Sequence, residues 1–208
     1  RTPVVADLDL SVAGIELGAS GIRVDDRLKT TNPKVFAIGD VTGGPQFTHV
    51  AGHQASLVVR QILFRMPARF VAERMPRATF TDPELGQIGL TPEAARERHG
   101  DKVSVHDVPL SSNDRARTER AGEGLVRLVA DRRGRIVGFG AAAPHAGELV
   151  GMVSLAMAGG VKLGTLASFV APYPTYGELA KAAGVAYYKE RLTGPSIRRI
   201  VSLLARFG

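Results

Sequence analysis

A short apolar run between a turn and a glycine, Val35 to Ile38, is the stretch that most restricts how this chain can fold. It is entered through Asn32-Pro33 and closed by Gly39-Asp40, which predicts a buried β-strand with a sharp stop. Gly39 would let the backbone approach a ligand, and Asp40 would lie just beyond the strand's carboxyl end, where open α/β sheets bind ligands. A carboxylate there could accept hydrogen bonds from sugar-like hydroxyls.

A helix of about four turns is predicted next, from Gln46-Phe47-Thr48-His49 to Arg65-Met66, with Pro67 as its stop. Small residues in its first turns, such as Ala51 and Gly52, would let another backbone or a flat ring lie close. Each feature alone is compatible with an ordinary turn. Together, the strand, the Gly-Asp turn and the helix start indicate a flavin contact.

Three motifs occur in the order found in a known family. They are T-T-N-P-K-V-F-A-I-G-D-V from Thr30, followed by F-T-H-V-A; T-F-T-D-P-E-L-G-Q-I-G-L-T from Thr79; and A-P-Y-P-T-Y-G-E from Ala171. This set resembles the carboxyl-terminal half of the pyridine nucleotide-disulfide oxidoreductases, the family of dihydrolipoamide dehydrogenase, glutathione reductase and mercuric reductase. The resemblance covers nearly the whole chain.

The resemblance implies FAD as cofactor, with Gly39 at the close approach and Asp40 on the ribityl chain. Gln46, Phe47, Thr48 and His49 would present helix-start donors to the flavin's pyrimidine oxygen. In the full-length parent, electrons would pass from NAD(P)H through FAD to a disulfide or other acceptor. The amino-terminal nucleotide fingerprint and redox cysteines are expected upstream, and the 208 residues contain no cysteine. The chain therefore looks like a fragment that would be inactive by itself.

The proline-rich loop from Ala171 to Glu178 holds the candidate catalytic residues. From the residues alone, Thr175 and Glu178 have the spacing of a capping box, with Tyr173 packing. In dihydrolipoamide dehydrogenase-like enzymes the loop reads H-x-x-x-x-E, and its His-Glu pair serves the redox thiols of the other subunit. Tyr173 stands where that His would be. A phenol, with a pKa near ~10, is a poor base but can donate a hydrogen bond. A tyrosine in this loop is similar to what mercuric reductase-like members of the family have there. It argues against a substrate of the lipoamide kind.

The predicted fold class is α+β. Residues 1–70 would be the carboxyl-terminal part of an α/β FAD-binding domain, with the exit from the NAD(P) domain, in which Gly21 to Asp25 alternate like an exposed strand.

Residues 71–192 would be an interface domain, an antiparallel sheet with helices on one side. Its elements are strands near 78–90, 102–110, 124–131 and 135–143, a helix begun by Thr91-Pro92, and helices over 147–161 and 175–188. A homodimer through the last two helices is expected, and a stand-alone dimerisation module is the alternative function.

Two further patterns favour ordinary structure over a ligand site. Gly138 to Ala143 fits the loose G-x-G-x-x-A nucleotide fingerprint, but no acidic residue follows at the required distance, so a hairpin strand is preferred. His49 and His53 share a helical face without a third ligand nearby, so no metal is expected.

The net charge of +7 is concentrated at the carboxyl end, where five Lys or Arg and one Glu follow Tyr187. No basic stripe interleaved with aromatics occurs elsewhere, so no nucleic-acid partner is expected.

Residues 193–208 predict a basic amphipathic helix with Ile197, Ile200, Val201, Leu204 and Phe207 on one face. Docking on the partner subunit is preferred to a role as a peripheral membrane adaptor, because one short helix binds lipid weakly. No signal peptide precedes the first motif, and a cytoplasmic location is expected.

Overall fold

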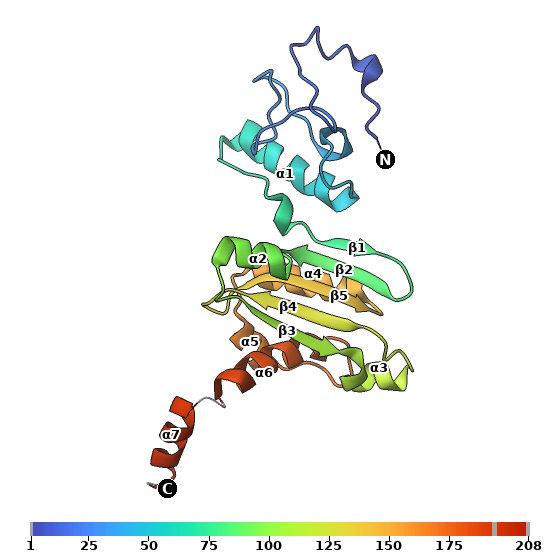
Figure 1. Cartoon of the computed structure of the whole chain (residues 1–208). Coiled ribbons are helices and arrows are strands. Elements are labelled where there is room, and N and C mark those ends of the chain that lie inside the picture. Colours follow the sequence, from blue (N-terminus) through green and yellow to red (C-terminus); the bar gives the residue numbers. More distant parts are fainter. Residues whose placement is uncertain (1, 193–194, 207–208) are drawn as a thin grey trace. The chain divides into compact units, whose positions relative to one another are not determined.

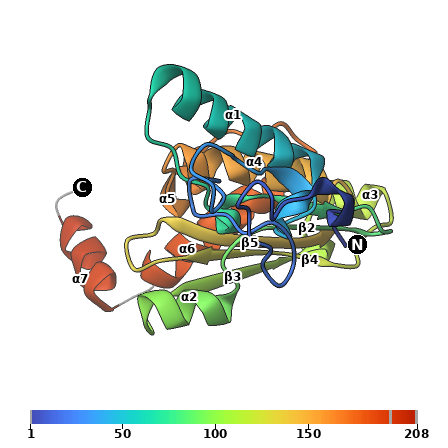
Figure 2. The ribbon, with the colours of Figure 1, turned by 90° about the horizontal axis from the view of Figure 1, so that it is seen from above.

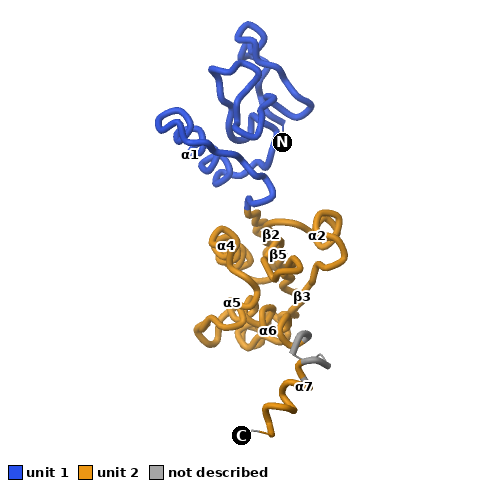
Figure 3. The backbone as a smooth tube through the Cα atoms, turned by 90° about the vertical axis from the view of Figure 1, so that its left-hand side faces the viewer, with its two compact units in different colours: residues 1–75 blue, residues 76–208 orange. Residues whose placement is uncertain are grey.

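The chain divides into two units at the Met75/Pro76 junction, as the computed structural model shows for residues 2–192 and 195–206 (Figures 1 and 3). The division falls later in the chain than the predicted domain boundary at residue 70, and residues 76–208 form a single unit.

Unit 1 is mostly irregular, with one long helix, α1 (Thr48–Phe64), and three short 3₁₀ turns. The turns are η1 (Ala6–Leu8), η2 (Gly39–Thr42) and η3 (Ala72–Arg74). Helix α1 begins and ends where the sequence predicts, because Arg65 adopts a left-handed conformation that closes the last turn. A small core of Ile15, Ile22 and Ala37 holds the loops together.

Two strands predicted for unit 1 are wrong. Residues 35–38 form one extended segment that pairs with residues 28–30 through a single bridge, Lys29 to Phe36, and only Ala37 of the four is buried. Gly21 to Asp25 likewise contributes only the bridge between Leu17 and Ile22. A strand is stabilised by neighbours that continue its hydrogen-bond ladder, and within the described part of unit 1 each segment makes an isolated bridge and scattered backbone hydrogen bonds without a continuous ladder.

Unit 2 is built on a five-stranded antiparallel sheet in the order β1-β2-β5-β4-β3. Its strands are β1 (Arg77–Thr79), β2 (Glu84–Gly89), β3 (Ser104–Pro109), β4 (Leu125–Ala130) and β5 (Ile136–Ala143). In the central strand, Phe139 stands opposite Ile88 of β2 and Leu128 of β4, and all three are buried. Gly138 to Ala143 lies within β5, so the hairpin-strand interpretation of that stretch is confirmed.

Helices cover both faces of the sheet (Figure 2). Helices α4 (Ala146–Ala158), α5 (Leu163–Ser168) and α6 (Glu178–Leu192) lie on one face and bury most of the core against it. Helix α2 (Pro92–His99) lies on the opposite face, so the expectation of helices on one side only is corrected. The start of α2 is as predicted: Thr91 caps it by accepting a hydrogen bond from the Ala94 amide at 3.2 Å.

Three short or terminal elements complete unit 2: η4 (Leu110–Ser112), α3 (Asp114–Thr118) and α7 (Pro195–Leu204). The first two were not predicted. Helix α7 matches the predicted carboxyl-terminal helix, although its expected residue Phe207 lies outside the described residues. Among the described residues, no helix is both long and apolar enough to cross a membrane.

Candidate functional site

A buried glutamine fixes the Gly39-Asp40 turn in unit 1. The amide of Gly39 donates to Oε1 of Gln54 on α1 at 2.6 Å, and Gln54 is only 2% exposed. Gly39 has φ +72°, and a Cβ added to it would lie 3.1 Å from Cβ of Ala51. A side chain would thus be strained by the left-handed backbone and crowded by α1. Gly39 and the side-chain amide of Gln54 therefore fix the distance between the turn and α1.

Beside this turn, Asp40 is exposed, and its carboxylate makes no hydrogen bond or ion pair within the described residues. Such a carboxylate is available to accept from hydroxyl groups. Helix α1 starts close by in sequence, and its N-cap residue, Phe47, supplies no side-chain cap. The dipole of such a helix start favours a partly negative oxygen.

The other predicted cofactor contacts lie at that helix start. Phe47 stacks on His49, with ring centroids 5.3 Å apart and planes inclined by 28°. Gln46 and Phe47 are half-buried, whereas Thr48 and His49 are exposed. A carboxylate that can accept from hydroxyls, at Asp40, and a glycine that lets a ligand approach the backbone, at Gly39, fit the ribityl chain of a flavin. The start of α1, whose N-cap residue supplies no side-chain cap, fits its pyrimidine edge.

In unit 2, Tyr173 projects from the loop that precedes α6. It is 71% exposed, and its peptide bond to Pro174 is cis. The phenol hydroxyl donates a hydrogen bond to Oδ2 of Asp114, at the start of α3, at 3.0 Å. This hydrogen bond and the charge of Asp114 raise the pKa of Tyr173 above its ordinary value. The neutral phenol therefore persists at physiological pH.

Glu178 acts on the same loop from the first turn of α6. Its Oε2 accepts from the Thr175 amide at 3.1 Å, which is one half of a capping box. The hydroxyl of Thr175 donates to the Pro172 carbonyl at 2.7 Å instead of capping the helix. Glu178 thereby holds the loop that carries Tyr173.

Two more hydrogen bonds join the α3 segment to the loop. Asn113, 5% exposed, donates through Nδ2 to the Thr175 carbonyl at 3.1 Å while its Oδ1 caps α3. Glu119 accepts from the buried hydroxyl of Tyr176 at 2.8 Å. Together with the Asp114 bond, these contacts fasten the loop to a helix about 60 residues upstream.

Sequence reasoning missed Asn113, Asp114 and Glu119, as well as Gln54. A signal for the first two was present, because Asn113 followed by Asp114 and two arginines is typical of a capped short helix. Nothing local in the sequence indicates which loop that helix would contact.

Burial raises the pKa of Tyr176 to about 12, and its hydrogen bond to the Glu119 carboxylate adds to the shift. The same bond, together with that from Arg115, lowers the pKa of Glu119. The pair is thus neutral phenol and charged carboxylate at neutral pH, the arrangement in which their hydrogen bond is strongest.

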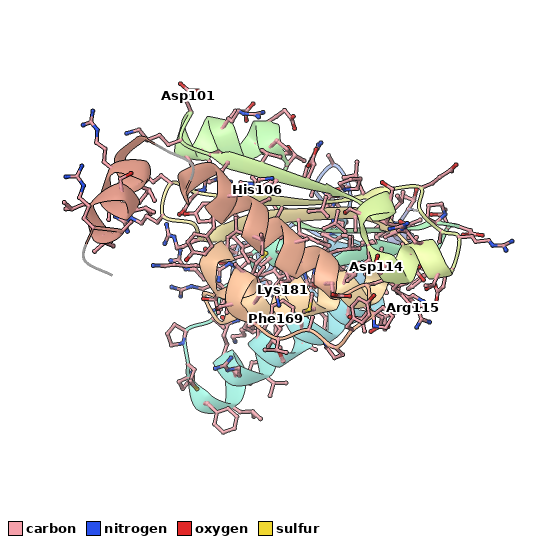
Figure 4. All side chains as sticks on the ribbon, turned by 90° about the horizontal axis from the view of Figure 1, so that it is seen from below. Asp101, His106, Asp114, Arg115, Phe169 and Lys181 are labelled. Atoms are coloured by element: carbon pink, nitrogen blue, oxygen red, sulfur yellow. The ribbon has the colours of Figure 1, made fainter. Side chains whose placement is uncertain are left out.

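A cavity of about 360 Å³ adjoins this network between α3, α6 and β3. Asp114 lies on α3 and Lys181 on α6, both labelled in Figure 4. The remaining lining residues are Val108, Ser112, Asn113, Glu178, Leu179, Ala182 and Val185. Among the residues that the structure describes, no group of three His, Cys, Asp or Glu side chains is placed to hold a metal ion.

Comparison with known proteins matches two family models to the chain. Residues 75–183 match the pyridine nucleotide-disulphide oxidoreductase dimerisation domain, and residues 2–55 match the pyridine nucleotide-disulphide oxidoreductase model. Both agree with the resemblance drawn from the sequence motifs.

Relatives and solved structures give the same result. A mercuric reductase of Bacillus cereus is 36% identical over 91% of this chain and 30% of its own length. A dihydrolipoyl dehydrogenase of Haloferax volcanii is 34% identical over 88% of this chain and 39% of its own. LpdA of Mycobacterium tuberculosis superposes with a TM-score of 0.81 at 25% identity, over 93% of this chain and 41% of that one. The HOCl-induced flavoprotein disulfide reductase RclA of Escherichia coli superposes with a TM-score of 0.77 at 28% identity. The superposition covers 89% of this chain and 43% of that one. The chain spans about a third of the length of the curated relatives it matches.

Proposed function

Since this chain belongs to the pyridine nucleotide-disulphide oxidoreductase family, we propose that it is the flavin-contacting and dimer-forming part of an FAD-dependent NAD(P)H oxidoreductase. The observation that carries the proposal is the pairing of an unpartnered Asp40 carboxylate with the Gly39 turn that Gln54 fixes against α1. The two parts of the proposal follow the predicted domains: residues 1–70 would belong to the flavin domain and residues 71–192 to the interface domain.

In unit 1, the residues already described would hold FAD through three groups. Asp40 would accept hydrogen bonds from ribityl hydroxyls, and Gly39 leaves room for that chain. The helix start at Gln46, Phe47, Thr48 and His49 would face the pyrimidine oxygen, where partial negative charge is favoured by the helix dipole. The chemistry that FAD supplies when bound is the passage of two electrons from reduced nicotinamide to an acceptor.

In unit 2, Tyr173 and Glu178 would serve the site of the neighbouring subunit in a homodimer. Tyr173 keeps its proton on the phenol oxygen, because Asp114 raises its pKa. It would therefore position an acceptor, or give up its hydrogen bond to Asp114 to donate to a thiolate, but it would not remove a proton at neutral pH. Glu178 would hold the loop in place, and Asp114 would be a positioning residue.

The acceptor that this chemistry suits is a disulfide or another two-electron acceptor that needs no neutral general base on this loop. A cytoplasmic location stays a prediction from the sequence. The second candidate function is a dimerisation module without catalysis, which is favoured by the complete sheet and separate core of unit 2.

The test is the intact mass of the protein from its native source, together with the absorbance spectrum of the same sample. A mass more than twice the 22.1 kDa of this chain, with a flavin spectrum, supports the oxidoreductase. A 22.1 kDa product without flavin leaves only the dimerisation module.

Substitution of Asp40 then tests the flavin contact itself. Asp40→Ala should lower the FAD content of the purified intact protein. The matched control is Asp7→Ala, which removes an exposed carboxylate elsewhere in unit 1 and should leave FAD content unchanged. Equal FAD content in both variants would remove Asp40 from the site.

A further inference from the structure

Helix α7 exposes an apolar face that no core of this chain covers. Ile200, Val201, Leu203 and Leu204 are 51%, 58%, 55% and 63% exposed. None of the described residues of α7 belongs to either hydrophobic core cluster. Exposed apolar side chains gathered on one side of a helix indicate an interaction surface.

The charged residues of the carboxyl-terminal segment are all positive. Residues 193–208 contain three arginines and no Asp or Glu. Arg199 and Arg206 are exposed, and neither makes an ion pair within the described residues. Arg199 and Ser202 lie on the side of α7 away from Ile197, Val201 and Leu204, and Arg206 follows in the turn just after the helix.

We propose that α7 binds the surface of an anionic phospholipid membrane, with its apolar face in the boundary of the acyl chains and its arginines at the phosphates. A strongly amphipathic helix with low net hydrophobicity and arginine on its polar face is the type that lies in the membrane interface. Its ten residues are about 15 Å long, about half the thickness of the hydrocarbon core, so it lies on the membrane and does not span it.

Charge decides between a lipid surface and a second copy of this chain. The tail from Tyr187 contributes +4 of the net +7, so residues 1–186 carry a net +3. Residues 1–186 of a second copy therefore carry no excess of negative charge that would attract a cationic helix, whereas an anionic leaflet strengthens binding by about fivefold for each Lys or Arg near the membrane surface. The exposed apolar face and this charge balance reverse the preference for docking on the partner subunit that the sequence alone suggests.

The experiment is co-sedimentation of the full chain with vesicles of phosphatidylcholine alone, or of phosphatidylcholine mixed with phosphatidylglycerol. We expect binding to the mixed vesicles, much weaker binding to phosphatidylcholine, and loss of binding as salt is raised. Arg199→Ala combined with Arg206→Ala should lower the partition coefficient by about twenty-fivefold. Ile200→Glu with Leu204→Glu should abolish binding to both vesicles.

The matched control is Arg132→Ala with Arg133→Ala, which removes the same charge from an exposed hairpin turn of unit 2. It should change binding less than twofold, and thermal unfolding should show every variant folded, since none of the described residues of α7 belongs to the core. Equal losses in the two arginine double variants would mean that net charge alone acts, and would overturn the proposal. It is also overturned if the α7 variants change only the oligomeric state, because α7 would then cover a protein surface.

Discussion

Two different replacements of Asn113 should separate the contributions of its two hydrogen bonds to stability. One of these bonds caps α3, and the other joins α3 to the Tyr173 loop. Its Oδ1 caps α3 at the Ala116 amide, 3.0 Å away, and its Nδ2 donates to the Thr175 carbonyl. Loss of an Asn cap costs about 1 kcal/mol, and loss of a buried hydrogen bond about 1 kcal/mol more. Asn113→Ala should therefore destabilise unit 2 by about 2 kcal/mol. Asn113→Ser keeps a capping oxygen but cannot reach Thr175, so it should cost about 1 kcal/mol.

Intrinsic tyrosine fluorescence makes the assay specific for unit 2. The chain has no tryptophan, and its four tyrosines all lie between residues 173 and 188. Urea unfolding followed by this signal should show midpoints in the order wild type, Asn113→Ser, Asn113→Ala, with equal slopes. Equal stabilities of the two variants, within about 0.5 kcal/mol, would mean that the bond to Thr175 contributes nothing and would refute the reasoning. A control, Ser112→Ala, changes the neighbouring residue, whose hydroxyl bonds only locally to Pro109.

Three other perturbations follow from the same geometry. Because the pKa of Tyr176 is raised to about 12 in the folded chain, its contribution to stability is complete below the unfolded pKa of about 10. That contribution to the free energy of unfolding, about 2–3 kcal/mol, is lost as the pH rises from about 10 to about 12. Urea unfolding measured across these pH values should show the loss in the wild type and not in Tyr176→Phe. Gln54→Leu leaves the buried Gly39 amide without its acceptor, so unit 1 should lose about 1–3 kcal/mol. Hydrogen exchange at Gly39 measures this, and unchanged protection there would contradict the role given to Gln54. Asp114→Asn should lower the pKa of Tyr173 toward its ordinary value, seen as phenolate absorbance at lower pH, whereas the same change at Asp101 should leave the titration unmoved.

Local sequence patterns were sufficient to predict most of unit 2 and the family. Alternation of apolar residues, the Arg132-Arg133-Gly134 turn and the Thr91 cap act over a few residues, so the strands and α2 could be located without knowledge of the fold. The family resemblance rested on motifs of the same local kind, and the matches to both family models bear it out.

Local pattern failed where a structure depends on a neighbour. Residues 35–38 have the composition of a strand, yet they form a single bridge because a ladder needs partners on the adjacent chain segment. The side of the sheet that α2 covers was also set by packing and not by its own cap or periodicity.

The contacts that hold the candidate site depend on the packing of distant segments. Asp114, Asn113 and Glu119 meet Tyr173, Thr175 and Tyr176 across 57 to 62 residues of sequence, and Gln54 reaches Gly39 across 15. No periodicity or spacing encodes such pairs, because each hydrogen bond forms only after packing has brought distant segments together. The sequence identified Tyr173 and Glu178 as candidates, and the fold made one a phenol held neutral by a carboxylate and the other the cap that holds its loop.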